Sequence, residues 1–270
     1  MKVYETGNIR NVVVMGHGGC GKTTLVEAIA YQTGITARMG KVTDGNTISD
    51  YDKEEQKRQF SISTSVVPVE FEDIKINFLD TPGYFDFVGE VEEACHAAGA
   101  AVIVINGKSG VEVGTLKAWE LCEKYKLPRL FFVTGMDDDQ ASYRKIVLEL
   151  NDRFGRKVAP FHVPIRENEK FVGFVNVVKM KGRRFINDTS EYEECDIPDY
   201  MDKHLNISRD ALVEAVADTS EELMERYFAG EEFTYEEVST ALRTHVMDCQ
   251  IVPVLVGSGV HNQGTSMLMN

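Results

Sequence analysis

The stretch Gly16-His-Gly-Gly-Cys-Gly-Lys-Thr23 decides the fold of this chain. It satisfies the pattern G-x-x-x-x-G-K-[ST], in which glycine-rich backbone forms a nest of amide groups around a phosphate. An apolar strand pattern at 11–15 precedes the stretch, and a helical pattern at 22–31 follows it. A strand, a glycine-rich turn and a helix N-terminus in this order predict a phosphate-binding loop in an α/β protein.

Each residue type of this loop has a chemical reason. Glycines let the backbone amides approach the β-phosphate, and the helix N-terminus adds partial positive charge. We expect the Lys22 ammonium to reach the β- and γ-phosphate oxygens and the Thr23 hydroxyl to bind Mg²⁺. The predicted nucleotide-binding residues of this segment are His17, Gly18, Gly19, Cys20, Gly21, Lys22, Thr23 and Thr24.

A second motif, Asp80-Thr-Pro-Gly83, follows the apolar strand pattern 75–79. A carboxylate after such a strand can hold Mg²⁺ through water, and the amide of a nearby glycine can sense the γ-phosphate. Alone, these residues are also typical of an ordinary turn, but their position 58 residues after Lys22 favours a nucleotide site. The polar segment 44–59, which lies between the motifs and is followed by 60–63, has few apolar anchors and predicts a loop that a ligand orders.

Two later loops are candidates for recognition of the base. Thr134-Gly-Met-Asp137 follows the strand pattern 129–133, and Gly257-Ser-Gly259 follows the pattern 251–256. An aspartate can accept hydrogen bonds from N1–H and N2–H of guanine, a pair of donors that adenine lacks. This favours guanine recognition by Asp137, with an acidic start of the next helix as the alternative. The candidate base-binding residues are Thr134, Asp137, Ser258 and Gly259.

The order of patterns along the chain predicts a mostly parallel sheet with crossover helices. Strands are predicted at 11–15, 75–79, 100–105, 129–133 and 251–257, and helices at 22–31, 114–125 and 141–154. Between these parts, the pattern changes to hairpin-like strands around 172–178 and to short helices. Two of the short helices are predicted to begin at the capping boxes Thr219-x-x-Glu222 and Thr234-x-x-Glu237.

These patterns predict an α/β fold, a P-loop NTPase domain interrupted by an α+β insertion subdomain. Residues 1–157 and 251–270 are expected to form the nucleotide-binding core, and residues 158–250 the insertion. A helix that should start near 264 is barely one turn long when the chain stops. We therefore expect further domains after Asn270.

Charge and composition limit the partners. Acidic residues outnumber basic ones by 43 to 29, and the net charge of −14 repels bulk polyanions, so any nucleic-acid contact must be local. The basic run Lys179-Met-Lys-Gly-Arg-Arg184 is interpreted as a solvated turn. The five scattered cysteines indicate neither disulfides nor a zinc site.

No apolar run approaches the ~18 residues of a membrane helix, and residues 1–10 lack a secretory signal. We expect a cytoplasmic monomer without DNA or membrane partners.

From Arg10 to Leu268 the sequence resembles the GTP-binding domain of translational GTPases, most of all that of elongation factor G and elongation-factor-G-like proteins. The similarity is carried by the phosphate loop, Lys41-Val42 and Asp50 before the first switch, Asp80–Gly83 with Phe87 beyond, and Gly257-Ser258. It extends into the insertion, where the similar segments are Val178–Lys181, Asp196–Pro198, Ser220–Met224 and Ala241–Arg243. The resemblance implies a GTPase that uses GTP hydrolysis to drive or time a rearrangement on the ribosome.

The resemblance also implies ligands and roles for single residues. The ligands would be GTP or GDP with Mg²⁺, and the partner would be the ribosome, through local contacts with ribosomal RNA and the stalk protein. The implied metal-binding residues are Thr23, Ser61 and Asp80, and guanine would be read by Asp137 and Ser258. The implied catalytic residues are Tyr84, Lys22 and Gly83.

Several positions depart from the family pattern. The motif D-T-P-G is followed in the family by a histidine that positions the attacking water, and here by Tyr84. A phenol does not become a cation at neutral pH, so we expect hydrolysis that is slow or uses another group. The family's N-K-x-D is replaced by Thr134-Gly-Met-Asp137, which lacks the lysine stem against the base and the amide that braces the phosphate loop. Gly19 and Gln59 replace the usual aspartate and glycine.

Three other functions stay open on the sequence alone. A nucleotide-sensing module that occupies the ribosome with little hydrolysis would fit the loss of the histidine. Tetracycline ribosomal protection proteins and GTP-hydrolysing release factors share the core motifs. A phosphate-loop ATPase or kinase is allowed because Thr134-Gly135 alters the base-binding motif.

Overall fold

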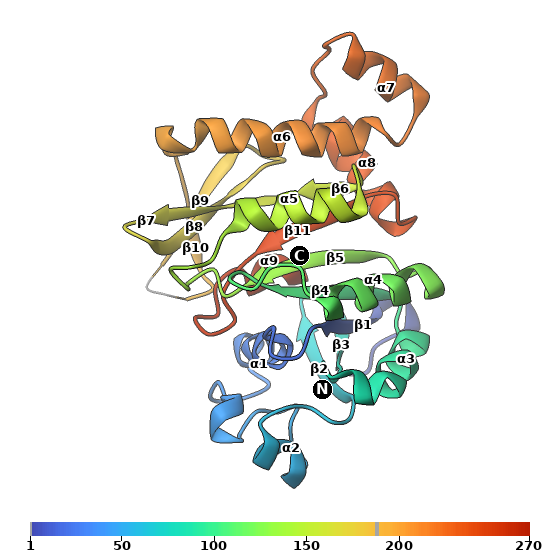
Figure 1. Cartoon of the computed structure of the whole chain (residues 1–270), viewed down its shortest axis with the longest axis vertical. Coiled ribbons are helices and arrows are strands. Elements are labelled where there is room, and N and C mark those ends of the chain that lie inside the picture. The colour runs from blue at the N-terminus through green and yellow to red at the C-terminus, as the bar shows by residue number, and fades with distance from the viewer. Residues whose placement is uncertain (1, 187–188) are drawn as a thin grey trace.

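The structure is a computed structural model that describes residues 2–186 and 189–270. It contains a seven-stranded sheet in the order β2-β3-β1-β4-β5-β11-β6 and a four-stranded sheet in the order β10-β9-β8-β7. Figure 1 shows β1–β4 of the main sheet with α1, α3 and α4 in the lower half of the molecule, and β6, β11, the small sheet, α6 and α7 in the upper half. Met1, in the predicted core, and residues 187–188, in the predicted insertion, lie outside the described residues.

The main sheet consists of β1 (Ile9–Gly16), β2 (Ser65–Phe71), β3 (Ile74–Asp80), β4 (Ala100–Asn106), β5 (Arg129–Thr134), β6 (Val158–Pro160) and β11 (Val252–Val256). The small sheet consists of β7 (His162–Glu167), β8 (Lys170–Asn176), β9 (Lys181–Phe185) and β10 (Tyr192–Cys195). The helices are α1 (Lys22–Gln32), α2 (Lys53–Arg58), α3 (Val88–Ala97), α4 (Val113–Tyr125), α5 (Tyr143–Phe154), α6 (Asp202–Ala217), α7 (Glu221–Phe228), α8 (Tyr235–Met247) and α9 (Thr265–Met269).

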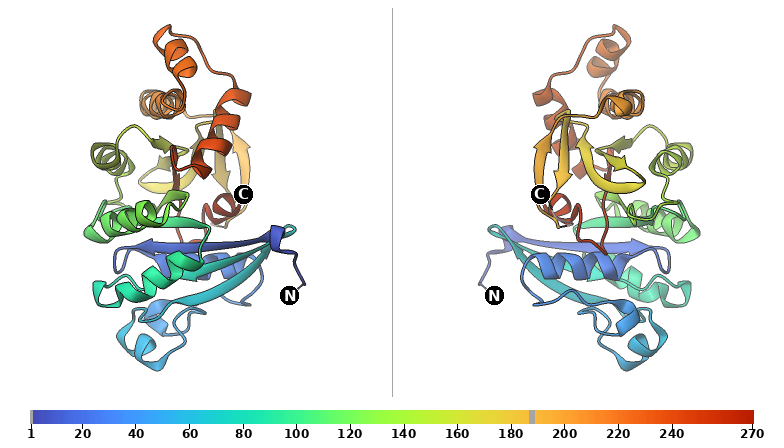
Figure 2. Two further views of the ribbon diagram at one scale, coloured as in Figure 1. Left: turned by 90° about the vertical axis from the view of Figure 1, so that its right-hand side faces the viewer. Right: turned by 90° about the vertical axis from the view of Figure 1, so that its left-hand side faces the viewer.

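The main sheet is covered by helices on both faces (Figure 2). Its strand pairs are parallel, except that β2 runs antiparallel to β3. Val13 and Val14 are adjacent in β1 but belong to different buried clusters, because successive side chains of a strand point to opposite faces. One cluster packs against α3, α4 and α5, and the other against α1 and α9. The predicted α/β fold with a mostly parallel sheet is confirmed.

The core elements agree with the sequence patterns, but the segment before β2 does not. Each predicted core strand and helix is present, with ends that differ by up to two residues. Segment 44–59, predicted as a loop ordered by ligand, contains α2, which Asp52 caps. The buried Glu55 carboxylate accepts hydrogen bonds from the backbone amides of Ile62 and Ser63 at 2.9 and 3.1 Å. The segment is therefore not a loop throughout, and buried polar groups serve as its anchors. That a ligand orders it stays a prediction.

The region predicted as the insertion contains the small sheet and α6, α7 and α8. Its first residues, 158–160, form β6, which pairs with β11 and so extends the main sheet. The basic run turns at 177–180, but its second half lies in β9. There the Arg183 guanidinium is buried against the Tyr192 ring, with 4.5 Å between guanidinium carbon and ring centroid. The prediction of a solvated turn is therefore wrong for Arg183.

The two predicted capping boxes differ in outcome. Thr234 and Glu237 form the box predicted at the start of α8. The box predicted at Thr219 is wrong by one residue, because Ser220 is the N-cap of α7. The Thr219 hydroxyl instead donates a hydrogen bond to the carbonyl oxygen of Val216 at 2.7 Å, at the end of α6. The Thr219 side chain thus bonds to the end of α6, although the sequence spacing predicts that it caps α7.

The five cysteines of the chain are free thiols, and Cys20, Cys95 and Cys122 are buried. In the part of the chain that the structure describes, no three His, Cys, Asp or Glu side chains form a cluster that could hold a metal ion. No helix in that part is long and apolar enough to cross a membrane. The metal site considered below therefore rests on hydroxyl and carboxylate oxygens.

Candidate functional site

The loop between β1 and α1 places backbone atoms around the Lys22 ammonium. A Cβ on Gly16 would lie 2.5 Å from the carbonyl oxygen of Val104, so only glycine fits at the end of β1. Gly21, the last residue before α1, has a left-handed φ of +100°, which favours glycine. The Lys22 Nζ donates hydrogen bonds to the carbonyl oxygens of Gly16 and His17 at 3.3 and 3.0 Å. The amine is thereby held inside the loop, where a phosphate would lie.

The segment after β3 lies directly against this loop. A Cβ on Gly83 would lie 2.5 Å from Lys22 Nζ and 2.7 Å from the Cα of Gly18, so a side chain does not fit there. Thr81 fixes the segment by donating a hydrogen bond from its hydroxyl to the carbonyl oxygen of Val14 at 2.7 Å. The two motifs that are far apart in the sequence thus meet at the Lys22 ammonium.

A cavity of about 240 Å³ lies where the two motifs meet. Its walls are the phosphate loop, the first turn of α1, the segment 59–61 and the pair Gly83-Tyr84. The Tyr84 ring lies over Gly18, because a Cβ on Gly18 would be 3.4 Å from it. The Phe60 and Tyr84 ring centroids are 4.7 Å apart. These two aromatic side chains therefore form one wall beside the phosphate loop.

Oxygen atoms suited to Mg²⁺ gather near this cavity. The Thr23 and Ser61 hydroxyl oxygens lie 3.2 Å apart, and Ser61 donates a hydrogen bond to Asp50 Oδ1 at 2.7 Å. Asp80 is 1% exposed, and neither of its carboxylate oxygens has a partner at hydrogen-bond geometry among the described residues. Burial raises the pKa of Asp80 to about 6, and the Lys22 ammonium opposes part of this rise. Buried carboxylate oxygens close to the Lys22 ammonium and the Thr23 hydroxyl fit a cation that prefers oxygen ligands.

Two predicted nucleotide-binding residues turn their side chains away from the cavity. His17 Nδ1 accepts a hydrogen bond from the Gly114 amide at 3.2 Å, and its Nε2 lies 3.6 Å from a Glu112 carboxylate oxygen, at the start of α4. Cys20 is buried in the apolar cluster on the α1 face, and this burial raises the pKa of its thiol. Both residues can therefore offer a nucleotide only their backbone.

The two loops predicted to hold the base lie side by side. The Gly259 amide donates a hydrogen bond to Thr134 Oγ1, and the Met136 amide donates one to the carbonyl oxygen of Gly257, both at 3.3 Å. A Cβ on Gly21 would lie 3.1 Å from Thr134 Cγ2. Thr134 therefore packs between the phosphate loop and the loop that follows β11.

Asp137 lies outside the walls of the 240 Å³ cavity, 3.7 Å from His261 between Oδ2 and Nε2. Ser258 is fully buried, and its hydroxyl accepts a hydrogen bond from the His261 amide at 3.3 Å. The alternative interpretation of Asp137–Asp139 as an acidic helix start is wrong, because α5 begins later, at Tyr143. The phosphate end and the base end are thus separate parts of one candidate site.

Residues 7–270 match the family model of the elongation factor Tu GTP-binding domain. The chain belongs to this family. It is therefore a GTP-binding domain of the translational GTPases, as the sequence resemblance implies. It is also similar to a crystal structure of ttk003000868 from Thermus thermophilus, at 36% identity and a TM-score of 0.88. The match covers 97% of this chain and 39% of that chain.

Three residues of this GTPase domain lie at the site although the sequence analysis gives them no role. Asp50 is 3% exposed and accepts the Ser61 hydrogen bond, and burial raises its pKa. Phe60 packs on Tyr84, and His261 faces Asp137. The stretch around Asp50 is rich in charges, so its burial has no signal in the sequence. His261 lies two residues after the Gly257–Gly259 loop, and this closeness in sequence is the only indication that it belongs to the site.

Proposed function

We propose that this GTPase domain hydrolyses GTP with Mg²⁺ while its protein acts on the ribosome, as an elongation-factor-G-like translation factor. One observation carries the proposal: Lys22, Gly83 and the Thr23 and Ser61 hydroxyls line one cavity. The buried Asp80 carboxylate lies behind this wall, where burial raises its pKa and Lys22 and Thr23 lie close enough to oppose this rise. A fixed cation, a close backbone and metal-binding oxygens are the parts that phosphoryl transfer needs. Residues 1–157 and 251–270 would form the nucleotide-binding core, residues 158–250 the insertion, and further domains would follow residue 270.

In this proposal Thr23, Ser61 and Asp80 hold Mg²⁺. The ion would neutralise charge on the β- and γ-phosphates. Asp50 has a supporting part, because its hydrogen bond at 2.7 Å fixes the Ser61 hydroxyl. The short distance between the Thr23 and Ser61 hydroxyl oxygens, 3.2 Å, supports a shared ligand.

Tyr84 is proposed to lie beside the attacking water. A neutral phenol can donate and accept a hydrogen bond, but it supplies no positive charge. Lys22 and the Gly83 amide would then carry the stabilisation of negative charge on the γ-phosphate. Contact with Phe60 limits how far the Tyr84 ring can move toward the phosphate. We therefore expect slower hydrolysis than a histidine at this position would give.

Guanine would be read by the Asp137 carboxylate, with Thr134, Ser258 and Gly259 shaping the pocket around it. The adjacency of the two loops supports this assignment. The net charge of −14 favours local contacts with ribosomal RNA and the stalk protein over a broad nucleic-acid surface. A cytoplasmic monomer without DNA or membrane partners belongs to the same proposal.

A second candidate function is a nucleotide sensor that binds the ribosome with little hydrolysis, and Tyr84 is the residue that favours it. A tetracycline-protection or release-factor type of GTPase would use the same core residues. The family match favours guanine nucleotides over the ATPase or kinase alternative.

Base preference is tested by calorimetric titration of the nucleotide-free chain with GTP, GDP and ATP in the presence of Mg²⁺. We expect guanine nucleotides to bind at least about tenfold tighter, a difference of ~1.4 kcal/mol. Omitting Mg²⁺ should weaken GTP binding, since the oxygens around Asp80 then lack their ion. Equal binding of ATP and GTP would overturn the guanine assignment of Asp137.

Ribosome-stimulated turnover of the protein distinguishes hydrolysis from sensing. Stimulated GTP hydrolysis by the wild type supports the enzyme, and its absence supports the sensor. Tyr84→His should raise turnover with little change in the Kd for GTP, because Tyr84 lies at the cavity wall and not in the phosphate loop. Tyr84→Phe, which keeps the ring on Phe60 and Gly18, is the matched control. An increase of orders of magnitude in Tyr84→His alone would favour the sensor.

A further inference from the structure

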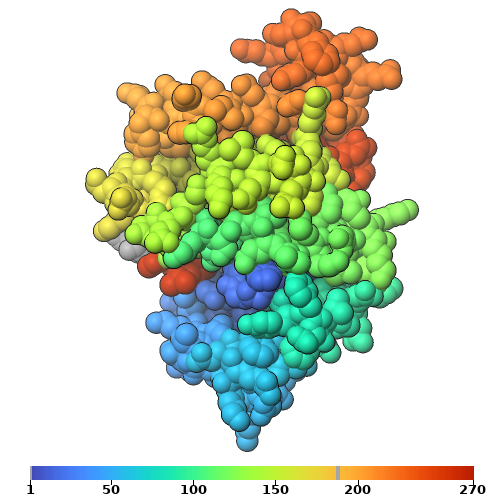
Figure 3. Space-filling model, viewed as in Figure 1, coloured from blue at the N-terminus to red at the C-terminus, as the bar shows by residue number. Residues whose placement is uncertain are grey.

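A second cavity, of about 330 Å³, lies between α5 and α6 and shares no lining residue with the nucleotide cavity. Figure 3 shows the two helices as neighbouring bands on one face of the molecule. Much of the lining is apolar, with Val147 and Leu148 from α5, Val163 and Pro164 from β7, and Ile207 from α6. A concave apolar site of this volume fits a small organic molecule.

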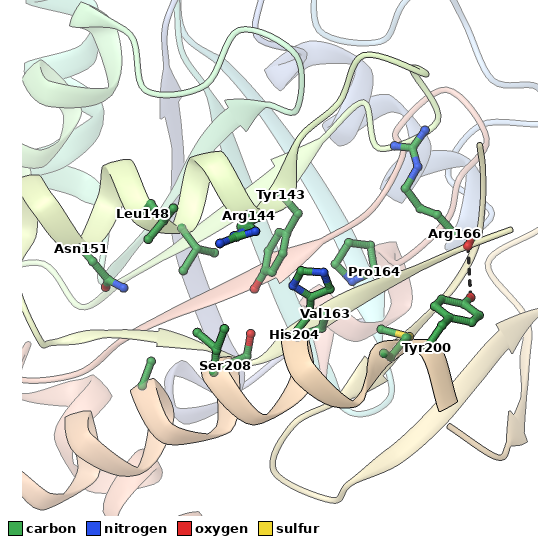
Figure 4. A pocket seen from close by; sticks show the side chains of 14 residues that line it. Tyr143, Arg144, Leu148, Asn151, Val163, Pro164, Arg166, Tyr200, His204 and Ser208 are labelled. Carbon is green, nitrogen blue, oxygen red and sulfur yellow. Dashed lines mark hydrogen bonds between the residues drawn. The ribbon is translucent and has the colours of Figure 1, made fainter. Parts of the chain in front are cut away.

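The Tyr143 hydroxyl is an unsatisfied polar group in this lining. Tyr143 is 8% exposed, and its hydroxyl has no hydrogen-bond partner within the residues that the structure describes. Figure 4 shows its ring between the two helices, with the hydroxyl directed toward α6. Burial raises the pKa of this hydroxyl, so it stays a neutral donor. A buried hydroxyl without a partner costs free energy that an acceptor on a ligand would recover.

The charged side chains that line the cavity are arginines. Arg144 and Arg166 line it, and no Asp or Glu does, although the chain has a net charge of −14. Arg144 follows Tyr143 in the first turn of α5, where the helix dipole favours a negative group. Across residues 2–186 and 189–270 the Arg144 guanidinium has no carboxylate partner. A buried donor and a free cation side by side in an apolar lining match an anionic head group (Figure 4).

We propose that this cavity binds a small amphipathic anion. Its apolar body would lie between Leu148 and Ile207, which are 58% and 51% exposed in the free chain. Its carboxylate-like or sulfonate-like head would accept hydrogen bonds from Tyr143 and Arg144. Apolar burial supplies the affinity in such a site, and the polar pair fixes the orientation.

Arg166 connects this cavity to the base-binding loop. Its guanidinium donates hydrogen bonds to the carbonyl oxygens of Met136 and Asp138, at 3.1 and 3.0 Å, on either side of Asp137. A ligand that lies against the Arg166 side chain would limit the motion of the residue that anchors this loop. A second ligand that needs the same loop ordered then binds more tightly. We therefore expect the anion to lower the Kd for GDP a few-fold, an expectation that rests on the proposed role of Asp137.

The test uses 8-anilino-1-naphthalenesulfonate, which combines planar apolar rings with a sulfonate and is detected by fluorescence. The chain should bind one molecule of this dye, and the uncharged analogue N-phenyl-1-naphthylamine should bind more weakly. Tyr143→Phe and Arg144→Gln should each weaken dye binding about fivefold, the usual value of one hydrogen bond. Ala211→Phe, which places a ring in the cavity, should abolish binding. The matched controls are Arg153→Gln in α5 and Phe228→Ser in α7, which is 77% exposed.

Circular dichroism and thermal unfolding of each variant separate loss of the site from loss of the fold. Tyr143→Phe should unfold at the same or a higher temperature, because it removes an unsatisfied hydroxyl. Equal dye binding by the wild type, Tyr143→Phe and Ala211→Phe would overturn the proposal. A dimer that Ile207→Ser converts to a monomer would also overturn it, since a second copy of the chain would then occupy the groove.

The proposed coupling between the anion cavity and the base-binding loop is tested separately, by the Kd for GDP with and without the dye. A lower Kd for GDP in the presence of the dye supports the connection through Arg166. An unchanged Kd in a chain that prefers GDP over ATP would overturn the connection and leave the dye site in place. Loss of any preference between GDP and ATP would instead be a failure of the proposed role of Asp137.

Discussion

The phosphate end and the base end of the nucleotide site are built in different ways. At the phosphate end, backbone packs against backbone or against a buried amine, so that a Cβ on Gly16 or Gly83 would approach other atoms to 2.5 Å. Its charged groups are buried, with Lys22 at 6% exposure. At the base end, Asp137 is partly exposed and its neighbour His261 is 47% exposed. A substitution in the phosphate loop disturbs packing, whereas one at Asp137 changes a contact with the ligand.

The chain departs from the family pattern at both ends. At the phosphate end the glycines, Lys22 and Thr23 of the loop pattern are kept, and the departures are Gly19, Gln59 and Tyr84. At the base end Thr134-Gly135 replaces the first two residues of the base motif. Gly135 has a φ of +68°, and a Cβ there would approach no atom closer than 3.4 Å. Packing leaves room for a side chain here, but the left-handed φ favours glycine. Gly135 is therefore constrained by its backbone conformation and not by its neighbours.

The strongest test of the comparison is Lys22→Ala. The phosphates would lose a charge-assisted donor in a buried place, and Asp80 would lose its nearby cation. We expect the Kd for GDP to rise at least ~100-fold, since hydrogen bonds to charged groups contribute about 1.5–3 kcal/mol each. Calorimetry measures this, with Lys53→Ala on the exposed side of α2 as the control. If Lys22→Ala raised the Kd for GDP less than Asp137→Ala does, the proposed difference between the phosphate end and the base end would be wrong.

The next effect is a pH dependence that the base end should not show. Because burial raises the pKa of Asp80 to about 6, the native chain without metal or nucleotide holds a proton that the unfolded chain has released. Stability therefore falls as pH rises from about 4 to 6, by roughly 2–3 kcal/mol at most, at 1.36 kcal/mol per pKa unit. Asp80→Asn should remove this fall.

Urea unfolding in the presence of a chelator, at several pH values between 4.5 and 7.5, measures this dependence. Asp139→Asn, an exposed carboxyl beyond the base loop, is the control and should keep the wild-type slope. Parallel curves for the wild type and Asp80→Asn would show that Asp80 is no buried proton acceptor. They would also remove one reason to place Mg²⁺ beside it.

At the base end, Asp137→Ala should change selectivity and leave the fold intact. We expect the Kd for GDP to rise about tenfold to thirtyfold, by 1.4–2 kcal/mol, while the Kd for ATP stays the same. The unfolding free energy should change by less than about 0.5 kcal/mol, because the side chain is partly exposed. Parallel titrations with GDP and ATP measure this, with Asp139→Ala as the control. Equal weakening of both nucleotides would place Asp137 in the fold and not in base recognition.

The sequence predicted the backbone-built parts of the molecule better than the parts built from buried polar groups. The glycine spacing of the phosphate loop and the apolar run at 100–105 have direct signatures, because they follow from φ angles and from strands covered on both faces. The burial of Glu55 and Asp50 and the position of His261 have none, since each depends on a few polar contacts between residues that are separate in the sequence. The sequence also does not indicate that the His17 side chain turns away from the cavity. The motif specifies the backbone at this position and leaves the side chain free.

The smallest expected effect belongs to Thr134, which connects the two ends. Its Cγ2 lies against Gly21, and its Oγ1 accepts the Gly259 amide hydrogen bond at 3.3 Å. Thr134→Val keeps the first contact and removes the second, so the unfolding free energy should fall by about 1 kcal/mol, the cost of a buried amide left without its acceptor.

Titrations of Thr134→Val with GDP and with pyrophosphate then show how independent the two ends are. If the base-end loop alone relaxes, GDP should weaken about threefold and pyrophosphate should be unaffected. Equal weakening of both ligands would mean that Thr134 also holds the phosphate loop, because pyrophosphate has no base for the relaxed loop to contact. The two ends would then be one cooperative unit, and Thr134→Asn, which offers an amide in the same place, should restore both affinities together.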